Sequence, residues 1–216
     1  MISHSKIDQT LKILLKEQKI TTMLDRLSKK YNPFKVLIST ILSARAKDEV
    51  TEVISKNLFK EYPTAKKLAS ANKKDVIKII RKIGFYNSKS KNIINASKML
   101  LEKFNNQVPK TMNELIELPG VGRKVANCVL VYAYKQNVIP VDTHVHRISN
   151  RLGWVKTKSP EDTEKALESL VPKRHWQILN DTLVSHGKTI CTPISPFCSK
   201  CPISAYCNKI NIKKHR

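Results

Sequence analysis

The sequence predicts an all-α protein, on two observations. Only 5 Gly and 10 Pro interrupt the 216 residues, so few residues that break helices are present. Apolar residues also recur at helical spacing almost throughout, as at Ile93, Leu100, Leu101 and Phe104, which would share one helix face with Ser97. Because no segment alternates convincingly between apolar and polar residues, we expect roughly ten or eleven helices and no sheet.

Helix start signals recur in chain order. Asn72 and Thr111 are each followed three residues later by an acidic residue, which is the pattern of a capping box. Ser159 precedes Pro160, which places proline at the first helical position. No internal repeat and no low-complexity linker appears, so any two lobes are expected to pack closely.

The composition is that of a globular protein, with 41% apolar and 26% charged residues. No apolar run approaches the roughly 18 residues that a membrane span needs. The first residues lack the apolar core of a signal peptide, and Asp8 and Glu17 argue against a transit peptide. We therefore expect a cytoplasmic protein that does not associate with a membrane.

Positive charge is the second strong feature of the composition. The chain carries 40 Lys and Arg against 17 Asp and Glu, a formal charge of +23. Residues 118–160 contain seven basic side chains and one carboxylate, Asp142, and residues 183–216 contain six basic side chains and no carboxylate. Such stretches are typical of a surface that binds the phosphate backbone of nucleic acid, although a basic protein that is merely soluble would also show them.

The segment from Gly120 through Val121 to Gly122 lies between two predicted helices. Two glycines allow a tight helix–hairpin–helix turn whose backbone N–H groups, with the amino terminus of the second helix, would form an anion site. The alternative is a turn that only reverses the chain. Arg123 and Lys124 follow directly, and they favour binding of a phosphodiester.

Lys124 and Asp142 are the candidate reactive residues. At the start of a helix, beside Arg123, the ammonium form of Lys124 is disfavoured, which would favour a nucleophilic amine over a solvated surface charge. Asp142 is expected to cap the helix that ends near Gly153, and its carboxylate would also stabilise a developing cation. The two roles are compatible, so Asp142 can perform both.

Three further side chains are interpreted as structural. His144 and His146 are two residues apart and would diverge on a helix, so they are not expected to ligate one metal. Cys128 is expected to be a small buried apolar side chain.

Four of the five cysteines form a cluster with the spacing C-x6-C-x2-C-x5-C, namely Cys191, Cys198, Cys201 and Cys207. Outside an oxidising compartment, such a cluster favours a metal site over disulfides. The spacing alone leaves zinc and an iron–sulfur cluster open, although the Cys201–Pro202 step slightly favours the latter.

Together these motifs resemble the endonuclease III family of helix–hairpin–helix DNA glycosylases. The resemblance covers about residues 35–207 and rests on the segments 42–46, 84–89, 118–124 and 141–143 and on the four clustered cysteines. It implies two helical lobes flanking a DNA-binding cleft: a six-helix lobe at 24–136, and a second lobe from 1–23 plus 137–216. The second lobe would hold a [4Fe-4S] cluster on Cys191, Cys198, Cys201 and Cys207.

The resemblance also implies an activity and site residues. The protein would be a monomer that acts on double-stranded DNA, excising oxidised pyrimidines and cleaving the strand at the abasic site by β-elimination. Lys124 would be the nucleophile and Asp142 the catalytic carboxylate. The residues implied to contact DNA are Gly120, Val121, Gly122, Arg123, Arg45, Phe85 and His144.

Two of these positions depart from the family. Arg45 stands where the family commonly has Gln, and Phe85 stands where it often has Leu. These positions fill the gap left by an extruded base, and the donors of Arg45 would favour guanine opposite the lesion. The alternative for Arg45 is a phosphate contact.

Two other functions remain open. A mismatch-type monofunctional glycosylase of the same superfamily would carry another residue at Lys124. A non-enzymatic DNA-binding module with a structural zinc on the four clustered cysteines would have no need of Lys124 and Asp142 together.

Overall fold

A computed structural model describes residues 3–18 and 20–216 of the chain. Over these residues every regular element is a helix and no strand is present, which confirms the all-α prediction. Twelve α-helices and three 3-10 helices occur in this part of the chain. The number exceeds the expected ten or eleven because short helices carry too few residues to show periodicity, as in α5 and α8.

The chain divides into two compact units, Met23–Gln136 and Met1–Thr22 with Asn137–Arg216. The first unit contains α2 (Met23–Ser28), α3 (Pro33–Ser43), α4 (Asp48–Glu61), α5 (Ala65–Ala69), α6 (Lys73–Ile80), α7 (Tyr86–Lys103), α8 (Met112–Leu115) and α9 (Arg123–Tyr134). The resemblance implies six helices here, and the two shortest of the eight, α5 and α8, account for the difference.

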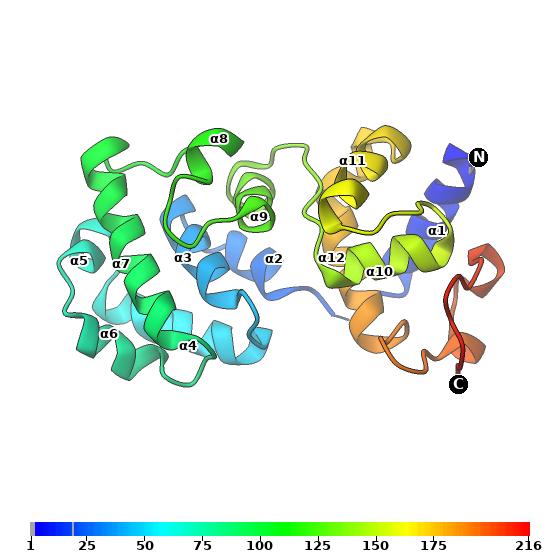
Figure 1. Cartoon of the computed structure of the whole chain (residues 1–216), viewed down its shortest axis with the longest axis horizontal. Coiled ribbons are helices and arrows are strands. Elements are labelled where there is room, and N and C mark those ends of the chain that lie inside the picture. The colour runs from blue at the N-terminus through cyan, green and yellow to red at the C-terminus, as the bar shows by residue number, and fades with distance from the viewer. Residues whose placement is uncertain (1–2, 19) are drawn as a thin grey trace. The chain divides into compact units, whose positions relative to one another are not determined.

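Helix α3 is the centre of the first unit. Eight of its 11 residues are buried, and α2, α4, α7 and α9 pack against it. Figure 1 shows α5 and α6 beside α7. The expected start signals are confirmed, because Asn72 accepts from the Lys74 N–H at 2.8 Å and Thr111 accepts from the Glu114 N–H at 3.4 Å. The helices of this unit are therefore fixed by local caps and by one apolar centre.

The second unit contains α1 (His4–Lys16), α10 (Thr143–Leu152), α11 (Pro160–Leu170), η1 (Lys173–His175), α12 (Trp176–Thr189), η2 (Cys198–Lys200) and η3 (Ser204–Tyr206). Helix α12 packs against both α1 and α10. Ser159 caps α11 with Pro160 at its start, as expected. No helix in the described part of the chain is long and apolar enough to cross a membrane.

The amino-terminal helix α1 is held against the rest of the second unit by polar contacts as well as by apolar packing. The Asp8 Oδ1 atom lies 2.6 Å from the His175 Nε2 atom, and Arg174 donates to the other oxygen of Asp8. Ile7 and Leu11 are fully buried in the same apolar core as Leu183. Residues far apart in the sequence thus form one folding unit.

Candidate functional site

The hairpin between α8 and α9 depends on one of its two glycines. Gly120 has a φ of +82°, and a Cβ there would lie 2.8 Å from the Asn92 Nδ2 atom. Gly122 has a φ of −97°, and a Cβ there would meet nothing within 4 Å. The positive φ and the close approach therefore require glycine at Gly120, whereas neither applies to Gly122.

A side chain at position 122 would nevertheless occupy space through which a ligand could approach α9. Gly122 is the N-cap residue of α9 and, having no side chain, supplies no capping oxygen to this helix. The open space beside Gly122 adjoins this amino terminus. Backbone N–H groups at the positive end of a helix are suited to bind an anion.

Lys124 is the second residue of α9. Its side chain is half-buried, and Arg123 before it is exposed. Cys128, one turn further along, is fully buried, as expected for a small apolar side chain. Lys124 thus lies in the first turn of α9, at a helix end whose N–H groups are suited to bind an anion.

Asp142 caps α10 in the other unit. Its Oδ1 atom accepts the N–H groups of His144 at 2.8 Å and Val145 at 2.9 Å, which confirms the expected N-cap. The helix ends at Gly153, which has a φ of +75° and confirms the expected end. Both hydrogen bonds fall on one oxygen, so the carboxylate is fixed in position by its own helix.

The two histidines of α10 diverge, as expected. The His144 Nδ1 atom lies 3.2 Å from the Arg147 Nη2 atom, whereas the His146 Nδ1 atom lies 2.6 Å from the Thr163 hydroxyl. A Cβ on Gly187 of α12 would lie 2.4 Å from the His144 Nδ1 atom. The glycine therefore allows α12 to approach the first turn of α10, where Asp142 is held.

Arg45 and Phe85, 40 residues apart in sequence, meet at the surface of the first unit. The guanidinium carbon of Arg45 lies 5.8 Å from the centroid of the Phe85 ring. Both residues have left-handed backbone conformations, with φ of 53° and 60°. Phe85 is 61% exposed, which is high for a large apolar side chain.

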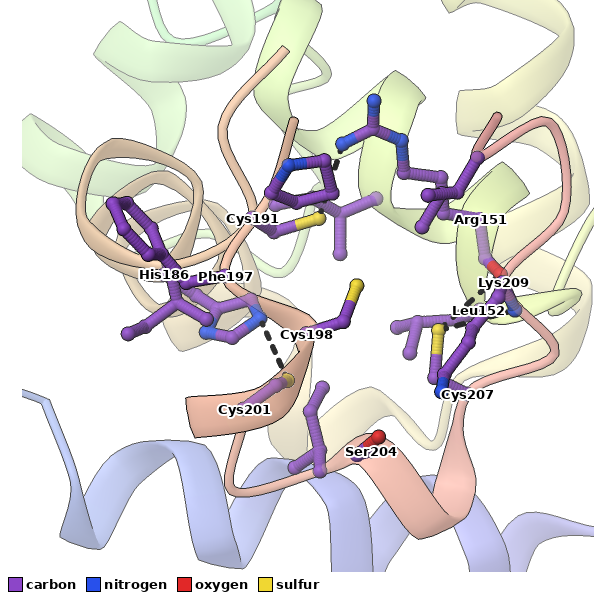
Figure 2. A pocket seen from close by; sticks show the side chains of 15 residues that line it. Arg151, Leu152, His186, Cys191, Phe197, Cys198, Cys201, Ser204, Cys207 and Lys209 are labelled. Carbon is purple, nitrogen blue, oxygen red and sulfur yellow. Dashed lines mark hydrogen bonds between the residues drawn. The ribbon is translucent and has the colours of Figure 1, made fainter. Parts of the chain in front are cut away.

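The four clustered cysteines line one pocket of the second unit. Figure 2 shows them around it, with Lys209 and His186 on opposite sides. Burial raises the pKa of the Cys201 thiol to about 11 and also raises the pKa of Cys207. Buried thiols with raised pKa values stay protonated at neutral pH unless a cationic group binds and holds the thiolates.

Several N–H groups point at the sulfur atoms. Arg151 Nη1 donates to Cys191 Sγ at 3.4 Å, and the Lys209 backbone N–H donates to Cys207 Sγ at 3.3 Å. Donors of this kind stabilise the sulfur charge of an iron–sulfur site. Among the described residues, no three His, Cys, Asp or Glu side chains are grouped to hold a single metal ion. The four cysteines line one pocket, which suits a group held by thiolate ligands.

Two arginines that hold this pocket were not among the residues predicted from the sequence. Arg151 is only 8% exposed and donates to the carbonyls of Thr192 and Pro193, both at 2.7 Å. Arg147 donates to the Cys191 carbonyl at 2.8 Å. The available signal was the i, i+4 spacing of the two arginines on the helix after Asp142, which puts both on one face.

Comparison with known proteins agrees with these features. A model of the family described as HhH-GPD superfamily base excision DNA repair protein matches residues 38–173. Endonuclease III of Thermotoga maritima is 46% identical over 88% of this chain and 89% of its own. Endonuclease III of Synechocystis sp. is 36% identical over 91% of this chain and 94% of its own. A solved structure of a trapped endonuclease III–DNA covalent intermediate has a TM-score of 0.87 and 34% identity, with 97% of each chain covered.

Proposed function

Because the chain belongs to the endonuclease III family of HhH-GPD base excision DNA repair proteins, we propose that it is a bifunctional DNA glycosylase and abasic-site lyase. The observation that carries the proposal is the position of Lys124 at the amino terminus of α9, which has no side-chain cap. There a phosphodiester bound by the helix would bring its sugar to the lysine amine. The covalent endonuclease III–DNA intermediate among the similar structures supports a mechanism in which the enzyme bonds to DNA.

The first chemical step is base release. The damaged nucleotide leaves the stack, since its C1′ atom cannot be reached inside a duplex. The lone pair of the neutral Lys124 amine forms a bond to C1′, while the C1′–N bond breaks and its electron pair leaves with the base, which takes up a proton. The Asp142 carboxylate stabilises the positive charge that develops on the sugar and accepts the proton that the attacking nitrogen loses.

The second step is strand cleavage. The sugar ring opens when its oxygen takes up a proton, and C1′ becomes an imine with Lys124. The protonated imine acidifies the C2′ hydrogen, so a base removes that proton. The bond from C3′ to the phosphate oxygen then breaks, with its electron pair on the leaving phosphate. Hydrolysis of the imine releases the cleaved strand and regenerates Lys124.

We assign DNA binding to two groups of residues in the first unit and one in the second. Gly120, Val121, Gly122 and Arg123 would bind phosphate through backbone N–H groups and charge. Arg45 and Phe85 would fill the gap left by the extruded nucleotide, Phe85 by stacking and Arg45 by donating to the orphan base. His144, in the first turn of α10, would contact the strand beside Asp142.

The pocket of Cys191, Cys198, Cys201 and Cys207 is proposed to hold a [4Fe-4S] cluster. The four thiols and the N–H donors around them fit that group. The thiolates of these four cysteines would hold the cluster, and its binding would contribute to the folding of the second unit. Iron and sulfide analysis should give about four of each per chain, whereas stoichiometric zinc would identify a zinc site on the same four cysteines.

The proposed substrate is double-stranded DNA with an oxidised pyrimidine or an abasic site, bound by a monomer. The test is incubation with thymine-glycol and abasic duplexes, with and without borohydride, which reduces the imine to a stable amine. We expect a covalent adduct on both duplexes and a cleaved strand without borohydride. Base release without an adduct would indicate a monofunctional glycosylase, and binding without either product would indicate a DNA-binding module.

A further inference from the structure

A buried lysine joins the two segments that carry Arg45 and Phe85. Lys89 lies in the first turn of α7, and only 5% of its surface is exposed. Its Nζ atom donates to the carbonyl of Leu42 at 2.8 Å and to that of Ala44 at 2.6 Å. These carbonyls belong to the end of α3, directly before Arg45.

The same residue also holds the Phe85 side. The Lys89 backbone N–H donates to the Phe85 carbonyl at 2.9 Å, which is the first hydrogen bond of α7. The segments are also close one residue earlier, where a Cβ added to Gly84 would lie 4.0 Å from the Arg45 carbonyl oxygen. One residue therefore bonds to Phe85 through its backbone and to the Arg45 segment through its side chain.

The charge of Lys89 suits this position. The last carbonyls of a helix lack intrahelical partners and form the negative end of its dipole, so an ammonium there is stabilised. Burial lowers the pKa of Lys89, because it disfavours the ammonium form. The hydrogen bonds from this ammonium to two carbonyls favour the charged form and offset part of that effect.

The two segments need such support. Arg45 and Phe85 both have positive φ, a left-handed conformation that is unfavourable for residues other than glycine. Strained conformations persist only where surrounding contacts fix them. An exposed cation–ring contact such as the one between the two side chains is weak, so it does not fix both loops by itself.

We propose that Lys89 is the positioning residue that fixes Arg45 and Phe85 relative to each other, and that it thereby sets the preference for the base opposite the lesion. The second part rests on the proposed function of Arg45 and Phe85. Lys89 itself touches no DNA, since its side chain is enclosed by the carbonyls it binds.

The experiment compares Lys89→Met, which keeps an unbranched side chain one atom shorter and removes the ammonium, with Lys91→Met as the matched control. Lys91 is an exposed lysine of the same helix. Lys89→Gln keeps a donor without the charge and serves as a second variant if Lys89→Met folds poorly. The readouts are the ratio of excision rates opposite guanine and opposite adenine, and hydrogen exchange of peptides spanning 43–47 and 84–88.

We expect Lys89→Met to reduce the guanine-to-adenine ratio about fivefold or more, to the value of Arg45→Ala, and to speed exchange in both peptides. The double variant should then match Arg45→Ala alone, because both changes remove the same interaction. Equal slowing opposite both bases, additive with Arg45→Ala, would overturn the proposal.

The experiment distinguishes failure of the positioning role of Lys89 from failure of the proposed function of Arg45 and Phe85. If no variant excises an oxidised pyrimidine, or if Arg45→Ala leaves the ratio unchanged, the proposed function of the pair is wrong. Hydrogen exchange still decides the role of Lys89 in that case: faster exchange confined to 43–47 and 84–88 supports it, and unchanged exchange overturns it.

Discussion

The guanidinium of Arg45 lies over the ring of Phe85, 5.8 Å from its centroid, although the two residues belong to different loops of the first unit. One loop joins α3 to α4 and the other joins α6 to α7. The contact restricts the conformations of both side chains. Restricted side chains lose less conformational freedom on entering a duplex than two independent side chains would lose.

Single substitutions of Arg45 and of Phe85 should affect excision in different ways. Arg45→Ala should slow excision opposite guanine more than opposite adenine, because the guanidinium matches the two acceptors of guanine. Phe85→Ala should slow both, since stacking does not depend on base identity and is worth about 1–3 kcal/mol. Single-turnover rates on duplexes that differ only in the opposite base measure this. Equal losses opposite all four bases for Arg45→Ala, with a smaller salt dependence, would make Arg45 a phosphate contact.

The two hairpin glycines should respond differently to the same change. Gly120→Ala places a Cβ 2.8 Å from Asn92 at a φ of +82°, so it should lower the free energy of unfolding by about 1–2 kcal/mol or more. An added Cβ at Gly122 meets nothing within 4 Å, so Gly122→Ala should lower stability less than Gly120→Ala, by no more than the weaker N-cap preference of alanine. Binding to damaged and undamaged duplexes should nevertheless weaken about tenfold, because the added methyl group lies where a phosphate would approach.

Thermal unfolding and duplex titration at several salt concentrations distinguish these outcomes. The wild type should lose affinity steeply with salt, with a slope near −0.9 for each neutralised phosphate. A loss for Gly122→Ala that is confined to damaged duplex would mean that the hairpin reads the lesion instead of the backbone.

Asp142→Asn should remove the charge and keep the cap. The amide oxygen of Asn can accept the same two N–H groups, from His144 and Val145, so the melting temperature should change little. Base release should slow about 100-fold or more, because the developing cation loses its carboxylate. Asp142→Ala is the comparison, since it also removes the cap and should cost about 1 kcal/mol of stability. A normal rate of base release in Asp142→Asn would exclude the catalytic role.

The contact between α1 and η1 should depend on pH. The hydrogen bond from His175, together with Arg174, lowers the pKa of the Asp8 carboxyl in the folded protein. Its contribution to stability is therefore complete above the pKa of the unfolded chain and is lost as the pH falls through the lower folded value. Urea unfolding should show Asp8→Asn less stable than the wild type at about pH 6, with the two converging toward about pH 2. A constant difference across this range would contradict the assignment.

The sequence was sufficient for features that depend on neighbouring residues. Helical periodicity predicted the all-α class, and the caps at Thr111, Asp142 and Ser159 lie where the signals placed them. The family resemblance was also accessible, because the hairpin, the Asp142 segment and the four cysteines occur in fixed order along the chain. Similarity to endonuclease III over most of the chain confirms it.

Features that depend on contacts between distant residues could not be predicted. Nothing in the sequence distinguishes Gly120 from Gly122, because the difference lies in Asn92 of α7. The burial of Lys89 requires the end of α3 to face α7, and a lysine between serines carries no sign of this. Arg151 and Gly187 likewise acquire their roles only when α10 packs on α12.

The identity of the lysine in the trapped adduct tests the central claim most directly. The chain contains many lysines, so formation of an adduct does not by itself assign the nucleophile. The protein is trapped with borohydride on an abasic duplex and digested, and the modified peptide is sequenced by mass spectrometry, with Lys98→Ala as a control at an exposed lysine of α7. The modification should fall on Lys124, and Lys124→Ala should give no adduct while binding DNA within about tenfold of the wild type. A modification on another lysine, or a normal adduct with Lys124→Ala, would contradict the proposed mechanism.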